Sequence, residues 1–309
     1  MNEIQSIEKF YQKIKTKEIK NKIKIFNLEK DSLTEEELIN SLKNNLLYTI
    51  PNTGGFKITI LALVTHIYQE GAQFFRARKL EKNFNVNAFE LKDFWEPPTH
   101  VVGLGRFNRP LEPYLYLTSG EYFTPKKEIG IKKGERYLLM YYTLNKVLPL
   151  LSFTQSDTIS KLSRQTRKKL KLILSFINDL MSSNNDNAHF ISSALSTEIL
   201  NFNELDGWCY QSIKDNNAIN ACVKVSKKEK FNLKHTFLCE LDEDGNDKFI
   251  GVFSILDDDV SYSSFDINPT KVEEAVNNLY QDNKKISKMK FILSKHNKTL
   301  PIVLPKILK

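Results

Sequence analysis

The residues best suited to chemistry lie in one stretch, Pro97 to Glu128, of this 309-residue chain. Gly105 stands directly before Arg106, so the backbone can turn tightly there without a Cβ clash. Tyr116 follows in a strand-like run, and the carboxylate of Glu128 closes the stretch. An arginine, an aromatic ring and a carboxylate in this order suit a pocket that holds an anion, stacks a flat ring and stabilises a developing positive charge.

Each of these residues also fits a structural role when it is taken alone. Arg106 could belong to a surface turn, Tyr116 to the core and Glu128 to the solvated surface. Glu121 is a second candidate for the carboxylate, because the pattern does not fix where the preceding strand ends. The stretch therefore gives a hypothesis that depends on the rest of the chain.

The net charge of +8 is concentrated in three basic segments: Lys13–Lys24, Lys161–Lys171 and the tail after Asp282. Such runs usually form solvated faces, and their lysine-rich composition with few interleaved aromatic residues argues against a nucleic-acid partner. The hydrophobic content of 41% and the charged content of 27% indicate a soluble globular protein with a sizeable core.

Cysteines, acidic runs and apolar runs restrict the chemistry further. Cys209, Cys222 and Cys239 lie in strand-like runs without Cys-x-x-Cys spacing, which predicts reduced core thiols in a cytoplasmic protein. The histidines are scattered and the run Asp257–Asp259 lacks calcium-loop spacing, so a solvated turn and no metal site are predicted. The N-terminus has no apolar signal-peptide core, and Ile58–Val64 is too short to span a membrane.

Helical signals occupy both ends of the chain and one internal region. Helices are predicted within 1–50, where Thr34 and Glu37 form a capping box, over Phe56–Tyr68, over 191–205 and from Thr270 onward. A long basic helix is predicted over 158–181.

This basic helix carries an apolar stripe from Ile159 to Leu180 at helical spacing. We expect the stripe to dock on the domain and four cations to face solvent: Lys161, Arg164, Lys168 and Lys171. The helix is then an accessory element outside the catalytic core.

Strand signals fill the remainder of the chain. Alternating or β-branched runs predict strands over 74–78, 114–118, 137–144, 208–213, 219–225, 236–241 and 249–256. Asp244-Gly245 predicts a hairpin turn between the last two. Since no repeat or linker is present, the chain is predicted to be one α+β domain with helical additions at both ends and one helical insertion.

Several of these segments together resemble the RES-domain family. The resemblance begins with Phe75-Arg76-Ala77-Arg78, Pro97-Pro98, Gly105-Arg106-Phe107-Asn108, Tyr114-Leu115-Tyr116 and Thr124 to Glu128. It continues with Asp206-Gly207-Trp208-Cys209-Tyr210-Gln211-Ser212, which is similar to the family's Asp-Gly-x-x-Tyr-x-Ser segment, and with Asn220. It covers about residues 70–145 and 190–245.

The family is named for an arginine, a glutamate and a serine, which the resemblance places at Arg106, Glu128 and Ser212. Tyr116 is the usual aromatic partner, and these four are the expected catalytic residues. The residues expected to bind NAD are Arg76, Arg106, Asn108, Tyr116, Tyr210, Ser212 and Asn220. Two departures are Arg109–Pro113, where the family often has a glycine, and Gln211, where it has a proline.

The resemblance implies an ADP-ribosyltransferase-like core of two packed curved sheets with an NAD-binding cleft. It implies destruction of NAD by hydrolysis or phosphorolysis of the nicotinamide–ribose bond, without a metal. It also implies a toxin or defence effector, with an antitoxin or immunity protein that covers the cleft. The expected parts are a helical extension (1–69), the catalytic domain (70–256) with a helical insertion (146–189), and a C-terminal helix and tail (257–309).

The residue types fit that chemistry. A carboxylate at Glu128 can stabilise oxocarbenium character on the ribose, and Arg106 can grip a pyrophosphate bidentately. Tyr116 can stack on nicotinamide, and the Ser212 hydroxyl can bond a phosphate or ribose oxygen. Two alternatives remain open: an ADP-ribosyltransferase that modifies protein or nucleic acid, and a nucleic-acid-binding module built on 158–181.

Overall fold

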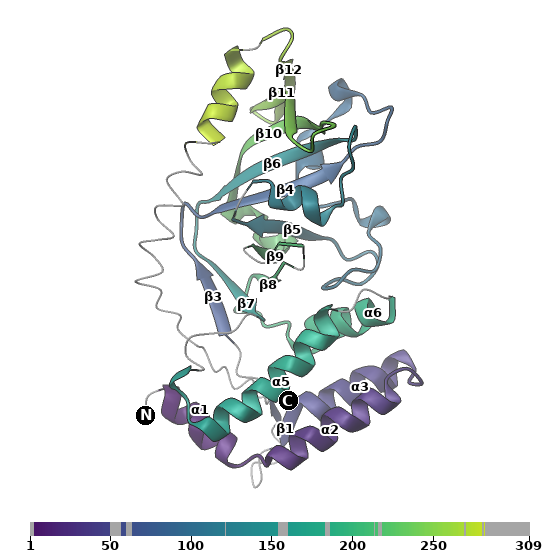
Figure 1. Cartoon of the computed structure of the whole chain (residues 1–309), viewed down its shortest axis with the longest axis vertical. Helices are drawn as coiled ribbons and strands as arrows, with labels where there is room; N and C mark the ends of the chain where they lie inside the picture. Colours follow the sequence, from purple (N-terminus) through teal and green to yellow (C-terminus); the bar gives the residue numbers. More distant parts are fainter. Residues whose placement is uncertain are drawn as a thin grey trace.

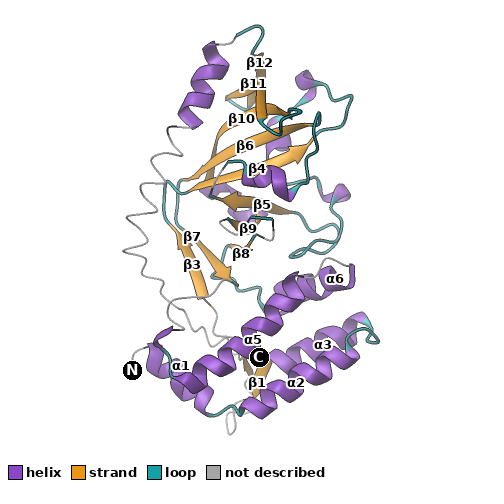
Figure 2. Cartoon of the chain, in the orientation of Figure 1, coloured by secondary structure: helices purple, strands orange, loops and turns teal. Residues whose placement is uncertain are grey.

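The computed structural model describes residues 3–49, 57–59, 64–120, 122–153, 160–182, 186–212, 214–215, 218–268, 270–279 and 281. A long curved sheet occupies most of the molecule, and a layer of helices lies beyond one end of it (Figures 1 and 2). The predicted α+β class is confirmed. No helix in these ranges is long and apolar enough to cross a bilayer.

The ten strands of the sheet have the order β12-β11-β10-β6-β4-β5-β9-β8-β7-β3. Every neighbouring pair is antiparallel except β7 and β8, which are parallel. The strands are β3 (Val64–Tyr68), β4 (Gln73–Lys79), β5 (Tyr114–Ser119), β6 (Arg136–Leu144), β7 (Leu148–Ser152), β8 (Gly207–Gln211), β9 (Ile219–Lys224), β10 (Phe231–Leu241), β11 (Asp247–Leu256) and β12 (Asp259–Ser264). A separate pair consists of β1 (Leu47–Thr49) and β2 (Lys57–Thr59).

One junction divides the sheet into two halves. Strand β4 pairs with β6 along seven residues, but with β5 only through Phe74 opposite Ser119 and Phe75 opposite Thr118. The strands β12-β11-β10-β6-β4 therefore lie on one side of a short junction, and β5-β9-β8-β7-β3 lie on the other. The core of two packed curved sheets that the resemblance implies is not confirmed, since hydrogen bonds join the ten described strands into one sheet.

The alternation of side chains gives the sheet two different faces. One face carries Phe74, Leu115, Leu138 and Met140, which pack in one apolar cluster. The other face is covered in two places by helices. At one end, Val272 and Leu279 of the predicted C-terminal helix, observed at 270–279, pack on β10 and β11. At the other end, the helical layer covers β7, β8 and β9.

The helical layer consists of α1 (Glu3–Gln12), α2 (Thr16–Glu29), α3 (Glu35–Leu46), α5 (Arg164–Ser182) and α6 (Asp186–Ala194). The predicted capping box is confirmed at the start of α3, where the Thr34 hydroxyl accepts from the Glu37 N–H at 3.4 Å and the Glu37 carboxylate accepts from the Thr34 N–H at 2.9 Å. A π-helical turn, Leu195–Ile199, continues α6.

Helix α5 has the amphipathic character that its sequence predicts. Leu170, Ile173, Ile177 and Leu180 of the helix are buried, whereas Arg164, Lys168 and Lys171 are exposed. Just before the helix, Leu162 is buried and Lys161 is exposed. Lys169 differs from its neighbours, because it is buried and donates a hydrogen bond of 2.6 Å to the Tyr11 carbonyl. Ile159 lies outside the described residues.

The helix predicted over Phe56–Tyr68 was wrong, and the helical insertion predicted over 146–189 holds for α5 and the start of α6 but not for its first part. Within Phe56–Tyr68 the described residues form β2 and β3, and within 146–189 residues Leu148–Ser152 form β7. The two segments pair with each other, with Val64 opposite Ser152 and Tyr68 opposite Leu148. Short apolar runs have no decisive period, so this long-range pairing, which is invisible in a local window, selects the strand.

Candidate active site

Glu128 ends the short helix α4 (Thr124–Glu128), which lies against β4 and β5 beside the junction of the two halves. Its carboxylate oxygen Oε1 accepts two hydrogen bonds, one from the Ser212 hydroxyl and one of 2.9 Å from the Asn220 amide. No hydrogen-bond or ion-pair partner of Oε2 is found within the described ranges. One oxygen is thus held in place while the other stays available.

The two donors are themselves oriented by their surroundings. Ser212 follows β8 and is buried, and its Oγ accepts from the N–H groups of Lys214 at 3.1 Å and Asp215 at 2.9 Å. The hydroxyl proton is therefore directed to Glu128. Asn220 lies on β9, and its carbonyl oxygen accepts from the Thr118 hydroxyl at 3.1 Å, which turns the amide nitrogen toward the carboxylate.

Asp215 ties the serine turn to α4. Its carboxylate accepts a hydrogen bond of 3.1 Å from Thr124 at the start of α4 and forms a 3.1 Å ion pair with Lys127. Because Asp215 also donates its N–H to Ser212, one residue fixes the distance between the carboxylate's helix and its serine partner. Asp215 has no motif of its own, so sequence reasoning missed it.

Sequence reasoning also missed Thr118 and Thr124 as residues of the site, although the sequence contained a signal for Thr118. Thr118 is two residues after Tyr116 on β5, so alternation places both side chains on one face. Thr124 is the first residue of α4 and precedes Pro125, a common helix-start arrangement, but nothing local indicates its bond to Asp215.

The Arg106 loop is built on Gly105 and Asn108. The Asn108 amide donates to the carbonyls of Gly103 at 2.8 Å and Arg109 at 3.1 Å. A Cβ on Gly105 would lie 2.2 Å from the side-chain oxygen Oδ1 of Asn108, so this close approach requires glycine.

Tyr116, which lies on β5, holds the Arg106 loop through its hydroxyl group. Its hydroxyl donates to the side-chain oxygen Oδ1 of Asn108 at 2.8 Å and accepts from the Phe107 N–H at 3.2 Å. Burial raises the pKa of the Tyr116 phenol, which therefore remains a neutral donor. The contacts of Tyr116 are thus those of a residue that positions Arg106, in addition to the stacking role expected for its ring.

Arg106 lies over the ring of Tyr210, with 5.7 Å from the guanidinium carbon to the ring centroid. Tyr210 is opposite Asn220 in the β8–β9 pair. Burial raises the pKa of the Tyr210 phenol, the charge of Glu128 raises it further, and the charge of Arg106 opposes both. Tyr210 therefore lies within the fields of both Arg106 and Glu128.

The helical layer contacts the arginine loop at two points. Arg109 forms ion pairs with Glu35 of α3 at 3.5 Å and with Glu198 of the π-helical turn at 3.2 Å. The buried Ser196 hydroxyl donates to the Phe107 carbonyl at 3.3 Å. The segment that departs from the RES pattern, Arg109–Pro113, thus begins with a residue that connects the loop to the helices.

The structure brings together seven of the eight residues predicted for the site. Glu128, Ser212 and Asn220 are in direct contact, Tyr116 contacts Asn108, and Arg106 lies on Tyr210.

Arg76 is not part of this group. On β4, Phe75 is opposite Thr118, so the next residue, Arg76, points to the other face of the sheet. There Arg76 donates to the carbonyl of Trp95, and burial lowers the pKa of its guanidinium. The alternative carboxylate, Glu121, lies outside the described residues.

The three cysteines are free and buried, as predicted. Within the described ranges, no group of three or more histidine, cysteine, aspartate or glutamate side chains could hold a metal ion. The arrangement can present the available oxygen of an oriented carboxylate, and one guanidinium, to a ligand. Comparison with family models, curated proteins and solved structures gives no match to this chain.

Proposed function

We propose that this protein is an NAD-consuming enzyme that cleaves the nicotinamide–ribose bond, and that it acts as a toxin or defence effector. The observation that carries the proposal is the carboxylate of Glu128. Its Oε1 accepts from Ser212 and Asn220, which are 84 and 92 residues away in the sequence. The resemblance to the RES-domain family selects these same residues, and it does so without knowledge of the contacts.

The geometry supports one role for each oxygen of Glu128. Two donors on Oε1 hold the carboxylate in a fixed orientation, so little reorganisation is needed when charge develops nearby. Oε2 has no partner among the described residues and can face the ribose. As the bond to nicotinamide lengthens, its electron pair stays on the nicotinamide nitrogen, and positive charge develops on the ribose beside Oε2.

The reaction then ends by attack on the ribose carbon. Nicotinamide leaves as a neutral molecule and needs no strong general acid. Water attacks, loses a proton to solvent and gives ADP-ribose, or phosphate attacks and gives the ribosyl phosphate. Arg106 is suited to the pyrophosphate of NAD, because a guanidinium fork donates two parallel hydrogen bonds to such groups. Tyr210 beneath the guanidinium restricts its orientation.

The topology is compatible with the ADP-ribosyltransferase-like core that the resemblance implies. Each half of the sheet has five strands, and the halves meet only through the short β4–β5 pairing. Helix α4 contacts both strands of that junction, so Glu128 lies where the two halves meet. A carboxylate at the junction is suited to a substrate that binds across both halves.

Product analysis tests this function. The purified chain is incubated with NAD, with and without phosphate, and nicotinamide, ADP-ribose and the ribosyl phosphate are quantified. We expect nicotinamide release in stoichiometric amounts and no label transferred to protein or nucleic acid. Intact NAD after prolonged incubation contradicts the proposal, and transfer of ADP-ribose to a macromolecule favours the alternative, a macromolecule-modifying ADP-ribosyltransferase.

One observation favours a second role, for the helical layer. Arg164, Arg167, Lys168 and Lys171 of α5 line a groove of about 710 Å³. None of Arg164, Lys168 and Lys171 forms an ion pair within the described ranges, so the groove can attract an anionic partner. If the partner is a nucleic acid, its affinity for the protein should fall steeply as the salt concentration rises. If the partner is an antitoxin with an acidic surface, its binding should stop NAD turnover.

A further inference from the structure

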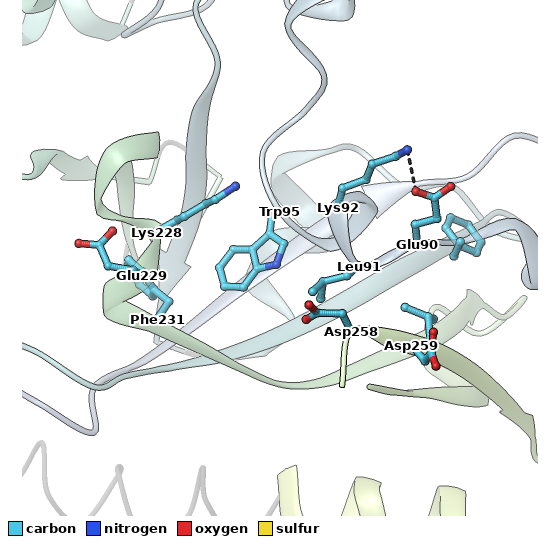
Figure 3. A pocket seen from close by; sticks show the side chains of 11 residues that line it. Glu90, Leu91, Lys92, Trp95, Lys228, Glu229, Phe231, Asp258 and Asp259 are labelled. Carbon is cyan, nitrogen blue, oxygen red and sulfur yellow. Dashed lines mark ion pairs between the residues drawn. The ribbon is translucent and has the colours of Figure 1, made fainter. Parts of the chain in front are cut away.

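A pocket of about 800 Å³ lies on the face of the sheet opposite Glu128. Its apolar wall contains the rings of Phe89, Trp95 and Phe231. Figure 3 shows Trp95 in the middle, between Lys228 on one side and Asp258 on the other. A cavity of this size with aromatic walls and a few charged groups is the usual form of a small-molecule site.

The position of Trp95 is fixed by the layer beneath it. Its ring centroid is 5.3 Å from that of Tyr142, and its carbonyl accepts a hydrogen bond from the half-buried Arg76. Arg78 holds the preceding turn through Asp93, at 3.1 Å to the carbonyl and 3.2 Å to the carboxylate. The aromatic wall is therefore formed before any ligand arrives.

The cations of the pocket are already paired. Lys92 forms a 2.7 Å ion pair with Glu90, drawn as a dashed line in Figure 3, and Lys228 forms a 2.7 Å ion pair with Glu96. Both lysines are thus neutralised by carboxylates within their own region. An anionic ligand would have to compete for cations that already have partners.

Three carboxylates that line the pocket, in contrast, have no ion-pair partner among the described residues. They are those of Glu229, Asp258 and Asp259. Asp257 and Asp258 form the two-residue turn of the β11–β12 hairpin with φ of 48° and 69°, a conformation that aspartate tolerates better than most residues. This turn places Asp258 and Asp259 at the pocket wall.

We propose that this pocket binds a small organic cation that carries an alkylated ammonium group. Aromatic faces attract such a cation through their quadrupoles, and the uncompensated carboxylates add a negative field. An alkylated ammonium is weakly hydrated, so contact with Phe89, Trp95 and Phe231 costs it little solvation. The carboxylates do not converge as metal ligands, since no metal-binding group of three or more is found in the described part of the chain.

Choline and its neutral carbon isostere, 3,3-dimethyl-1-butanol, provide the test, because they share a shape and differ in charge. Trp95 and Trp208 are the two tryptophans of the chain, and Trp208 is buried on the other face. Trp208→Phe leaves Trp95 as the fluorescence reporter, and calorimetry on the parent chain avoids any loss of stability from that change. We expect choline to change Trp95 emission saturably, and to bind at least about tenfold more tightly than the isostere.

Charge removal sharpens the test. Asp258→Asn with Asp259→Asn should weaken choline binding by about tenfold, and Trp95→Leu should abolish it. Asp257→Asn is the matched control, since Asp257 lies in the same turn, has the same kind of backbone conformation and does not line the pocket. Equal affinity for choline and its isostere, no binding of choline by the parent chain, or an equal loss in Asp257→Asn would each overturn the proposal.

Discussion

The Glu128 site and the α5 surface both carry charged side chains, but neighbouring groups constrain these charges very differently. Glu128 accepts two hydrogen bonds on one oxygen, and both donors are held by further bonds. Arg164, Lys168 and Lys171 of α5, and Lys161 shortly before it, are exposed. Within the described part of the chain, none of these four side chains forms a hydrogen bond or ion pair that would orient it. A fixed charge can act on one atom of a ligand, whereas mobile surface charges act only together, through a long-range field that salt screens.

The largest effect is expected at Glu128. Glu128→Gln keeps the shape and can still accept from Ser212 and Asn220, but it removes the charge. NAD turnover should fall by at least roughly 100-fold while the unfolding midpoint changes little. The control is Glu112→Gln, which alters an exposed carboxylate of the same stretch and should retain turnover. Full activity in Glu128→Gln together with loss in Glu121→Gln would show that Glu121 is the catalytic carboxylate.

A change at Asn220 tests how the carboxylate is held. Asn220→Asp places a second carboxylate in the 2.9 Å contact with Glu128. Like charges at this distance disfavour ionisation, so the pair keeps a proton to higher pH, and the acidic limb of the pH–rate profile should move up by about one unit or more. Asn220→Ala removes the donor without adding charge. An unchanged profile in Asn220→Asp would contradict the contact.

The effect expected at Arg106 is smaller and concerns binding. Arg106→Ala should weaken NAD affinity by about tenfold, and Arg106→Lys should restore little of it, because a lysine is a point charge where a planar fork is needed. Arg109→Lys is the neighbouring control, since a lysine there can retain ion pairs with Glu35 and Glu198. Parent-like NAD affinity in Arg106→Lys would argue against a pyrophosphate contact.

The smallest effect is expected on α5. Replacing Lys161, Arg164, Lys168 and Lys171 with glutamine should leave turnover and its salt dependence unchanged if they form only a solvated face. Steering of NAD by these charges predicts instead a lower second-order rate that approaches the parent rate at high salt. Loss of folding would contradict both, because it would mean that the charges anchor the helix in place of its apolar stripe.

Sequence alone predicted the elements that carry a clear local signal. The strand-like runs Tyr114–Thr118 and Tyr137–Leu144, the helical stripe of α5 and the Thr34–Glu37 capping box are all found in the structure. Local signals of this kind depend on a few adjacent residues, so long-range packing does not change them.

The errors share a different cause. Val64–Tyr68 and Leu148–Ser152 are short apolar runs that become strands only because they pair with each other across the fold. The continuity of the sheet likewise depends on two residue pairs between β4 and β5, which no local pattern reveals.

For the site, the sequence indicated which residues act together, but it did not indicate which contacts they form. Glu128, Ser212 and Asn220 were selected by resemblance, and their contacts follow from the fold. Asp215, which fixes the serine turn to α4, lies in no motif and gave no signal. Arg76 matched a motif, yet strand alternation directs its side chain to the opposite face.

The central claim is that Oε2 of Glu128 faces the ribose carbon at which the bond to nicotinamide breaks. The most direct test is a crystal structure of Glu128→Gln with intact NAD, because this variant should bind the dinucleotide without cleaving it. We predict that the nicotinamide ribose carbon lies about 3.5 Å from the free side-chain atom of residue 128, with the pyrophosphate on Arg106. NAD bound elsewhere, for example in the Trp95 pocket, or a ribose turned away from residue 128, would contradict the account.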